Sequence, residues 1–258
     1  MKTIHTSLLT SLTALALCTS LATAQEAPAK PLEIDKKNLF AKGHTWQFDV
    51  TLTMPKEATA ALGVDVKPTE TEDGLVYKFV ETQQCIGTLE IPQLKRKLPV
   101  INVFFGGKLK KRQILALEDG QLHFYGMLNP DYKKEGDTQG VVMNTPIIMA
   151  SEKAVVGDKW TWKEENLGLP EFQFRCIAKD QKVTVNGTTY TADKISMNQV
   201  KKDTKEIMLT KEYWIVAGVG LVKEEEKQFI GDKTIVKTLE LKSFRMLEPK
   251  QGETFKNK

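Results

Sequence analysis

Turn signals that recur about every ten residues constrain this chain more than any other feature of its sequence. They separate short apolar runs, and helical periodicity is almost absent. The run over residues 46–54 is typical of a half-buried β-strand, because one face carries Trp46, Phe48, Val50, Leu52 and Met54 and the other face is polar. We therefore expect a mainly β, single-domain protein. Its large curved antiparallel sheet would form a half-barrel or a barrel-like structure with one or two short helices.

The same reasoning predicts the remaining elements. Asp119-Gly120 and Asn186-Gly187 are predicted to turn two hairpins, since both dipeptides suit the positive φ values of a type I′ turn. A short helix is expected over 55–62, where proline begins and glycine follows the segment, and a helical turn over 146–150. The other expected strands cover residues 75–81, 84–91, 98–105, 109–117, 122–128, 159–164, 171–178, 195–200, 207–216, 219–230 and 234–246, and residues 183–190 are expected to form the hairpin that Asn186-Gly187 turns.

Two glycines near the end of the chain are predicted to bend a strand. Gly218 and Gly220 lie in the segment Ala217-Gly218-Val219-Gly220, between the apolar run 213–216 and the run 221–223. Glycine inside a strand pattern marks a bulge or a sharp bend. No helix follows, so the pair is not a phosphate-binding loop. We interpret Gly218 and Gly220 as a structural bend that lets one long strand pair twice around a curved sheet.

A short motif occurs twice. Gly43-x-x-Trp46 and Gly157-x-x-Trp160 each enter a strand and are followed by a second aromatic residue. Either a glycine turn leads by chance into two aromatic strands, or the chain contains a duplication. The sequence alone slightly favours the first interpretation.

The N-terminus predicts export. Residues 1–24 have the charge, the apolar segment and the small residues before the cleavage point of a signal peptide. Residues 25–35 are expected to be a disordered leader, 36–247 the antiparallel β domain, and 248–258 a frayed tail. The expected location is periplasmic or secreted. Lipoprotein anchoring at Cys18 is disfavoured, because Leu17 stands where a lipobox needs a small residue.

Cys85 and Cys176 remain after the predicted cleavage. An oxidising compartment favours a disulfide between them. The alternative is a pair of buried free thiols, because free cysteine packs as a small hydrophobic residue. Both interpretations stay open.

Several segments resemble a known type of protein. They are Leu39-Phe40-x-x-Gly43-x-x-Trp46, Val156-Gly157-Asp158-x-Trp160, Val183-x-Val185 with Ala192-x-Lys194-Ile195, and Tyr213-Trp214 followed by Gly218-Val219-Gly220-Leu221-Val222-Lys223. This combination resembles exported bacterial β-rich proteins of unknown function. Their curved antiparallel sheet is similar to the half-barrel of the periplasmic lipoprotein carriers, which cups an apolar ligand. The resemblance implies an envelope location and no catalytic residues. Val216-Ala217 departs from the pattern, which commonly has a proline there.

Residues for catalysis are sparse. The mature chain holds only His44 and His123, too few for a clustered zinc site, and no motif pairs either histidine with a cysteine. We expect no catalytic residues, no metal, no cofactor and, at a net charge of +4, no nucleic-acid partner. Glu224 and Glu226 share a strand face, which we expect to be solvated.

A basic window without acidic residues lies between Glu90 and Glu118. It could contact an anionic membrane surface or an acidic envelope protein. The alternative is that its charges provide solubility and protect sheet edges. The window consists of Lys95, Arg96, Lys97, Lys108, Lys110, Lys111 and Arg112.

Aromatic residues on the apolar strand faces are the other candidate site. On a curved sheet they could line a concave pocket for an apolar or lipid-like ligand, or they could fill an ordinary core. The candidates are Trp46, Phe48, Val50, Trp160, Trp162, Phe172, Phe174 and Trp214. The sequence thus favours a non-enzymatic binding or carrier module. The first alternative is a structural or interaction protein that docks through a sheet edge or the basic hairpin, and the second is a hydrolase.

Overall fold

The computed structural model describes residues 39–57, 66–72, 74–131, 140–164 and 168–246. All of them belong to one compact unit. The predicted signal peptide, leader and tail lie outside the described residues, as does most of the helix expected over 55–62.

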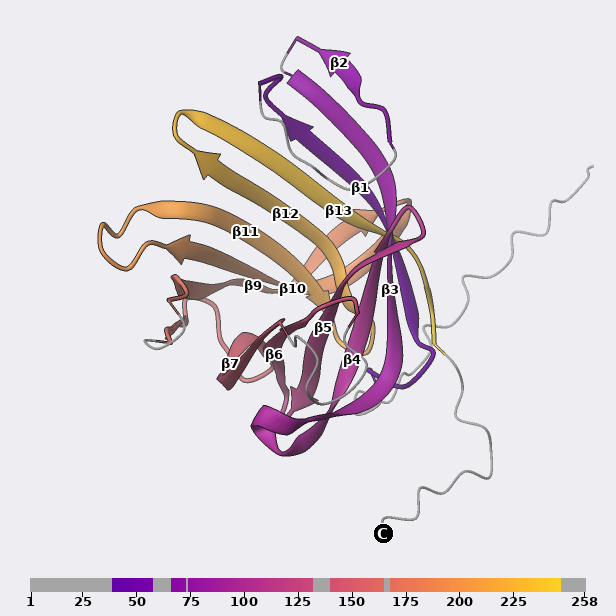
Figure 1. Cartoon of the computed structure of the whole chain (residues 1–258), viewed down its shortest axis with the longest axis vertical. Helices are drawn as coiled ribbons and strands as arrows, with labels where there is room; N and C mark the ends of the chain where they lie inside the picture. Colours follow the sequence, from indigo (N-terminus) through magenta and orange to yellow (C-terminus); the bar gives the residue numbers. More distant parts are fainter. Residues whose placement is uncertain (1–38, 58–65, 73, 132–139, 165–167, 247–258) are drawn as a thin grey trace, which may run out of the picture. The chain divides into compact units, whose positions relative to one another are not determined.

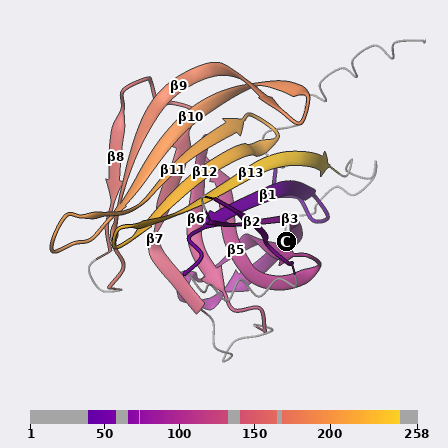
Figure 2. The ribbon, with the colours of Figure 1, turned by 90° about the horizontal axis from the view of Figure 1, so that it is seen from above.

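One antiparallel sheet forms the molecule, as the sequence predicts (Figure 1). Twelve strands follow one another in the order β7-β6-β5-β4-β3-β1-β13-β12-β11-β10-β9-β8, and β2 adds to β3. The sheet curves into a nearly closed barrel (Figure 2). The strands are β1 (Thr45–Met54), β2 (Thr69–Thr71), β3 (Gly74–Ile91), β4 (Arg96–Phe105), β5 (Lys108–Glu118), β6 (Gln121–Leu128), β7 (Gly140–Ser151), β8 (Lys159–Trp162), β9 (Glu171–Val185), β10 (Thr188–Val200), β11 (Ile207–Val216), β12 (Gly220–Ile230) and β13 (Lys233–Arg245).

The two predicted hairpins are confirmed. Asp119 and Gly120 have φ values of 52° and 76° between the paired strands β5 and β6. Asn186 and Gly187 have φ values of 46° and 79° between β9 and β10. Both pairs therefore adopt the positive φ values that a type I′ turn requires.

The motif that occurs twice is paired in the same way each time. The Gly43 N–H donates to the carbonyl of Cys85 (2.7 Å), and the Cys85 N–H donates to the carbonyl of His44, the residue after Gly43 (2.9 Å). The Gly157 N–H donates to the carbonyl of Cys176 (2.9 Å), and the Cys176 N–H donates to the carbonyl of Asp158, the residue after Gly157 (2.9 Å). A chance likeness of two turns does not explain this shared long-range pairing. The structure therefore favours duplication, the alternative that the sequence left second.

Strand order fits a duplicated unit. β1 and β3–β7 form one run of six neighbouring strands, and β8–β13 form another. The first strand of one half, β1, pairs with the last strand of the other, β13. The equivalent junction between β8 and β7 is bridged by side chains. There Trp160 and Trp162 donate their indole N–H groups to the carbonyls of Ile148 (2.7 Å) and Thr145 (2.8 Å) on β7. Two tryptophans thus connect the last two edges of the sheet.

Three expectations are wrong in detail. Residues 146–150 lie in strand β7, where Ile147 pairs with Phe124 of β6, so that sheet pairing overrides the local helical turn. Residues 75–81 and 84–91 form one strand, β3, which continues through a bulge next to Gly87. Gly218 and Gly220 do not bend one long strand. They close a hairpin in which Val216 pairs with Gly220, because the Val219 N–H donates to the Val216 carbonyl (3.1 Å).

Apolar residues lie on both faces of the sheet. Beyond Gly87, the end of β3 stays paired with the start of β4. Residues of β3 and β4 pack there against residues of β5 and β6 in a separate cluster, none of which lines the cavity described below. That cluster contains Ile91, Leu98, Val100, Ile114, Ala116, Tyr125 and Leu128. The alternate residues of the same strands face the barrel interior. The outer face is thus a packed core, and the interior is left to hold the candidate site.

Candidate functional site

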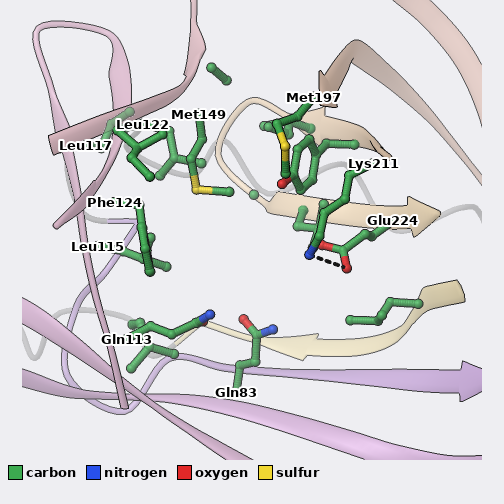
Figure 3. Close-up of a pocket in the computed structure, with 18 of the residues that line it drawn as sticks. Gln83, Gln113, Leu115, Leu117, Leu122, Phe124, Met149, Met197, Lys211 and Glu224 are labelled. Carbon is green, nitrogen blue, oxygen red and sulfur yellow. Dashed lines mark hydrogen bonds and ion pairs between the residues drawn. The ribbon is translucent and has the colours of Figure 1, made fainter. Parts of the chain in front are cut away.

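A cavity of about 430 Å³ lies inside the barrel (Figure 3). Every strand of the twelve-stranded path except β8 contributes to its lining. Small-molecule sites are typically clefts or cavities of about 300–1,000 Å³. The interior is therefore large enough for a ligand, although most of the surrounding positions are filled by the protein's own side chains.

One wall of the cavity is apolar. It comes mainly from β5, β6 and β7 and continues onto β9 and β10 (Figure 3). These side chains alternate with the outer core residues of the same strands, as the pleat of a sheet requires. The wall contains Leu115, Leu117, Leu122, Phe124, Ile147, Met149, Phe172, Phe174 and Met197.

The other wall carries charge. Lys211 of β11 forms ion pairs with Glu224 (3.3 Å) and Glu226 (2.5 Å) of β12. Lys237 of β13 approaches Glu81 of β3 at 3.5 Å. All five side chains line the cavity, and Gln83 and Gln113 point into the same space (Figure 3). We call Glu81, Lys111, Lys211, Glu224, Glu226 and Lys237 the interior charge cluster.

The expectation of a solvated face at Glu224 and Glu226 is wrong. Their shared face is the barrel interior, where only 7% of Glu224 is exposed. Register explains this position, because Glu226 lies opposite Lys211 and Glu224 opposite Tyr213. An acidic run alone could not reveal the lysine that pairs with it from the next strand.

Electrostatics keeps these groups ionised. Burial raises the pKa of Glu224, but the nearby ammonium groups of Lys211, Lys237 and Lys111 outweigh it and hold the pKa below its usual value. Burial lowers the pKa of Lys211, but its acidic neighbours, Glu224 foremost, raise it well above the usual value. The Lys211–Glu224 pair is thus formed by two charged groups in the barrel interior.

The structure places the predicted aromatic candidates in two groups. Trp46, Phe48, Phe172 and Phe174 line the cavity, whereas Val50, Trp160, Trp162 and Trp214 do not. Trp160 and Trp162 instead bridge the edge of β7, as described above. Trp214 lies on the opposite strand face from its neighbour Tyr213, between the ammonium groups of Lys194 and Lys223.

The basic window is divided between different places. Arg96, at the start of β4, pairs with Glu118 at the end of β5 (2.5 Å). The residues from Lys108 onward begin at the opposite end of that hairpin, where Phe105 pairs with Lys108. Lys111 lines the cavity, whereas Lys110, the extra residue of a bulge between β4 and β5, is not part of the lining. The sequence grouped residues that the sheet separates by position and by face.

Both cysteines are buried free thiols. Cys85 lies on β3 and Cys176 on β9, with five strands between them along the sheet, so the structure gives the predicted disulfide no support. Burial raises the pKa of each thiol, which keeps it protonated and disfavours it as a nucleophile. Within the described ranges, no three His, Cys, Asp or Glu side chains are grouped to hold a metal ion, and no helix is long and apolar enough to cross a membrane.

Sequence reasoning missed most of the lining. The apolar wall from β5–β7 and the lysines at 211 and 237 were not predicted as site residues. Alternation could have identified the wall, since Leu115 and Leu117 share a strand face with Lys111 and Gln113 across a bulge. Which of the two apolar faces encloses the cavity depends on the course of β3 beyond Gly87, which the sequence does not show.

Comparisons with known proteins find similarity only among solved structures. No family model and no curated protein matches the chain. An exported-protein candidate with a YmcC-like fold from Bacteroides fragilis has a TM-score of 0.41 at 11% identity, over 80% of this chain and 96% of that one. A candidate lipoprotein from Parabacteroides distasonis has a TM-score of 0.36 at 11% identity, over 80% and 96%. A β-barrel-like protein of the domain of unknown function DUF1849 from Brucella abortus has a TM-score of 0.38 at 11% identity, over 81% and 99%. The first two are an exported-protein candidate and a lipoprotein candidate, and the third is a domain of unknown function, in keeping with the exported β-rich type that the sequence resembles.

Proposed function

We propose that this protein is a non-enzymatic binding or carrier module that holds one apolar or lipid-like molecule inside its barrel. A single observation carries this proposal: the interior of the sheet encloses a cavity of about 430 Å³ with a continuous apolar wall on one side and polar groups on the other. Apolar lining with a few placed polar groups is the usual composition of a ligand site. The signal-peptide pattern of residues 1–24 supports an exported protein of the cell envelope.

The charged groups of the interior support binding more than catalysis. Lys211 and Lys237 are ion-paired to carboxylates. The two buried thiols have raised pKa values. His123 contacts Glu118 and Gln121, and neither His123 nor Glu118 lines the cavity. The basic window supports docking less than a single cationic face would, because Lys111 lines the cavity and Arg96 pairs with Glu118.

Filling the cavity should abolish ligand content. In Met149→Trp a larger side chain occupies the apolar wall, so we expect the variant to carry at least tenfold less ligand than the wild type, which should carry about one molecule per chain. The measurement is mass spectrometry of organic extracts of protein purified from its native envelope. Val156→Trp is the control, since Val156 is 61% exposed in the segment before β8 and is not in the lining.

Circular dichroism confirms that each variant remains folded. Repeated extraction of a folded wild-type protein without a stoichiometric apolar molecule contradicts the carrier role. If another envelope protein co-purifies in its place, the docking alternative is favoured.

A further inference from the structure

The interior charge cluster has one member that its neighbours leave unmatched. With every group ionised, three ammoniums and three carboxylates balance, but their pairing is uneven. Lys211 forms ion pairs with Glu224 and Glu226, and Lys237 forms one with Glu81. Within the described part of the chain, the Lys111 side chain forms neither an ion pair nor a hydrogen bond. Its ammonium therefore enters the cavity without a fixed partner.

Gln113, near Lys111, is a second polar side chain without a hydrogen-bond partner among the described residues. Gln113 is two residues further along β5, on the same strand face, and lines the same cavity. Across β4, Val103 lies opposite both Lys111 and Gln83, which places Gln83 two strands from Lys111 on the interior face. Figure 3 shows the Gln113 and Gln83 amides facing each other at the polar end. The Gln83 amide already donates to Glu81 Oε1 (2.8 Å), so Lys111 and Gln113 are the two N–H donors of this group without a hydrogen-bond partner among the described residues.

These donors lie at one end of the apolar wall. On β5, Leu115 and Leu117 follow Lys111 and Gln113 toward the end of the strand, and all four residues line the cavity. Leu122 and Phe124 extend the apolar surface onto β6 (Figure 3). Along β5 the lining therefore changes from the cationic and hydrogen-bonding side chains of Lys111 and Gln113 to the apolar side chains of Leu115 and Leu117. Past Leu117, at the turn after β5, the lining also includes Ser151 and Glu152. A ligand that fits this gradient has a polar head and an apolar tail.

We infer that the bound molecule is an amphiphile with an anionic head group, a carboxylate or a phosphate, and that Lys111, assisted by Gln113, binds that head while the tail lies along the wall formed by Leu115, Leu117 and Phe124. This inference rests on the proposed function. Charge-assisted hydrogen bonds from an ammonium to such an anion are among the strongest in proteins. The electrostatics is consistent with the assignment. Burial lowers the pKa of Lys111, the carboxylate of Glu81 opposes this effect, and the charges of Lys237 and Lys211 add to it. An anion at Lys111 would favour its charged form.

The test compares three probes of equal chain length: hexadecanoate, hexadecyl phosphate and hexadecanol. Their dissociation constants are measured with delipidated full-length mature protein, in the wild type and in Lys111→Met. We expect the wild type to bind at least one of the two anions about tenfold or more tightly than the alcohol, a difference of about 1.4 kcal/mol. In Lys111→Met this preference should fall below about threefold, while the affinity for hexadecanol stays within about twofold of the wild type. The anion with the larger preference identifies the head group.

Lys110→Met is the matched control, because it removes the neighbouring charge of the same strand, which does not line the cavity. It should keep the wild-type preference, and Lys111→Arg should keep most of it. Equal binding of anions and alcohol by the wild type overturns the inference, as does a Lys111→Met variant that retains the preference. In both cases the proposed function survives. If none of the three probes binds saturably, the proposed function fails together with the inference.

Discussion

Replacing Lys211 by methionine should lower the free energy of unfolding by about 3–5 kcal/mol, the usual cost of removing one partner from a buried ion pair. Lys211 is the only member of the interior charge cluster paired with two carboxylates, at 3.3 Å from Glu224 and 2.5 Å from Glu226. The variant leaves both carboxylates in the barrel without their nearest cation. Urea denaturation at pH 7 measures the loss.

Two further variants separate charge from packing. Lys201→Met removes an exposed pair with Glu206, whose side chains are 44% and 60% exposed, and should cost no more than about 1 kcal/mol. Combining Lys211→Met with Glu224→Gln and Glu226→Gln should recover most of the stability, since neither carboxylate is then left unpaired inside the barrel. A triple variant as unstable as Lys211→Met would show that the lysine acts through packing alone.

The Lys211→Met defect should depend on pH. In the wild type the pKa of folded Glu224 lies below its unfolded value, so its contribution to stability is present at neutral pH and is lost as the pH falls through the folded pKa. Without Lys211, burial dominates and that pKa rises above the unfolded value. Protonation of Glu224 then removes the unpaired buried charge of the variant as the pH falls. The difference in unfolding free energy between the wild type and the variant should therefore narrow between pH 7 and pH 4. A gap that is constant over this range contradicts the assignment of the defect to charge.

Gly126→Ala should cost more stability than the same change at any open turn, by at least about 3 kcal/mol, or should prevent folding. Gly126 has a φ of +133°, and an added Cβ would lie 2.1 Å from the backbone carbonyl oxygen of Val141 on β7. A positive φ alone costs an L-residue about 1–2 kcal/mol. The clash adds to this cost, because the carbonyl belongs to the neighbouring strand and cannot move without breaking the β6–β7 pairing.

Gly107→Ala provides the matched control. Gly107 also has a positive φ, +83°, but nothing lies within 4 Å of a Cβ added there. We expect it to lose only the backbone cost of about 1–2 kcal/mol. Both variants are measured by denaturant unfolding, with soluble yield and far-ultraviolet circular dichroism as the measure if Gly126→Ala does not accumulate as folded protein. Equal losses at the two glycines would contradict the close approach of β6 and β7.

Much of the fold could be predicted because its signals are local. The alternation from Trp46 to Met54 identifies β1, and the Asp-Gly and Asn-Gly turns identify two hairpins with their strands. Each of these signals lies within about ten residues of sequence. The course of β3 could not be predicted, because the bulge next to Gly87 belongs to the long-range pairing of β3 with β4, and Ile91 finds its apolar neighbours on β4, β5 and β6.

The candidate site was predicted less completely, because it depends on register between strands. Phe172 and Phe174 were identified by their alternation. Trp214 was predicted to face the ligand, but its neighbour Tyr213 lines the cavity, so Trp214 lies on the opposite face of β11. One residue of register reverses a strand's faces. Likewise, Lys111 belonged to a surface window in the sequence, and only the closed sheet directs it inward.

The central claim, that the barrel cavity binds one amphiphile, can be tested at the atoms that line it. Met149 and Met197 line the cavity and Met54 does not, although all three lie in the described sheet. In delipidated protein labelled with ¹³C at the methionine methyl groups, titration with hexadecanoate should shift the Met149 and Met197 resonances saturably at one molecule per chain. The Met54 resonance should stay in place, and nuclear Overhauser effects should connect the tail to Met149. Saturable binding that leaves Met149 and Met197 unchanged, or no binding at all, would contradict a ligand site inside the barrel.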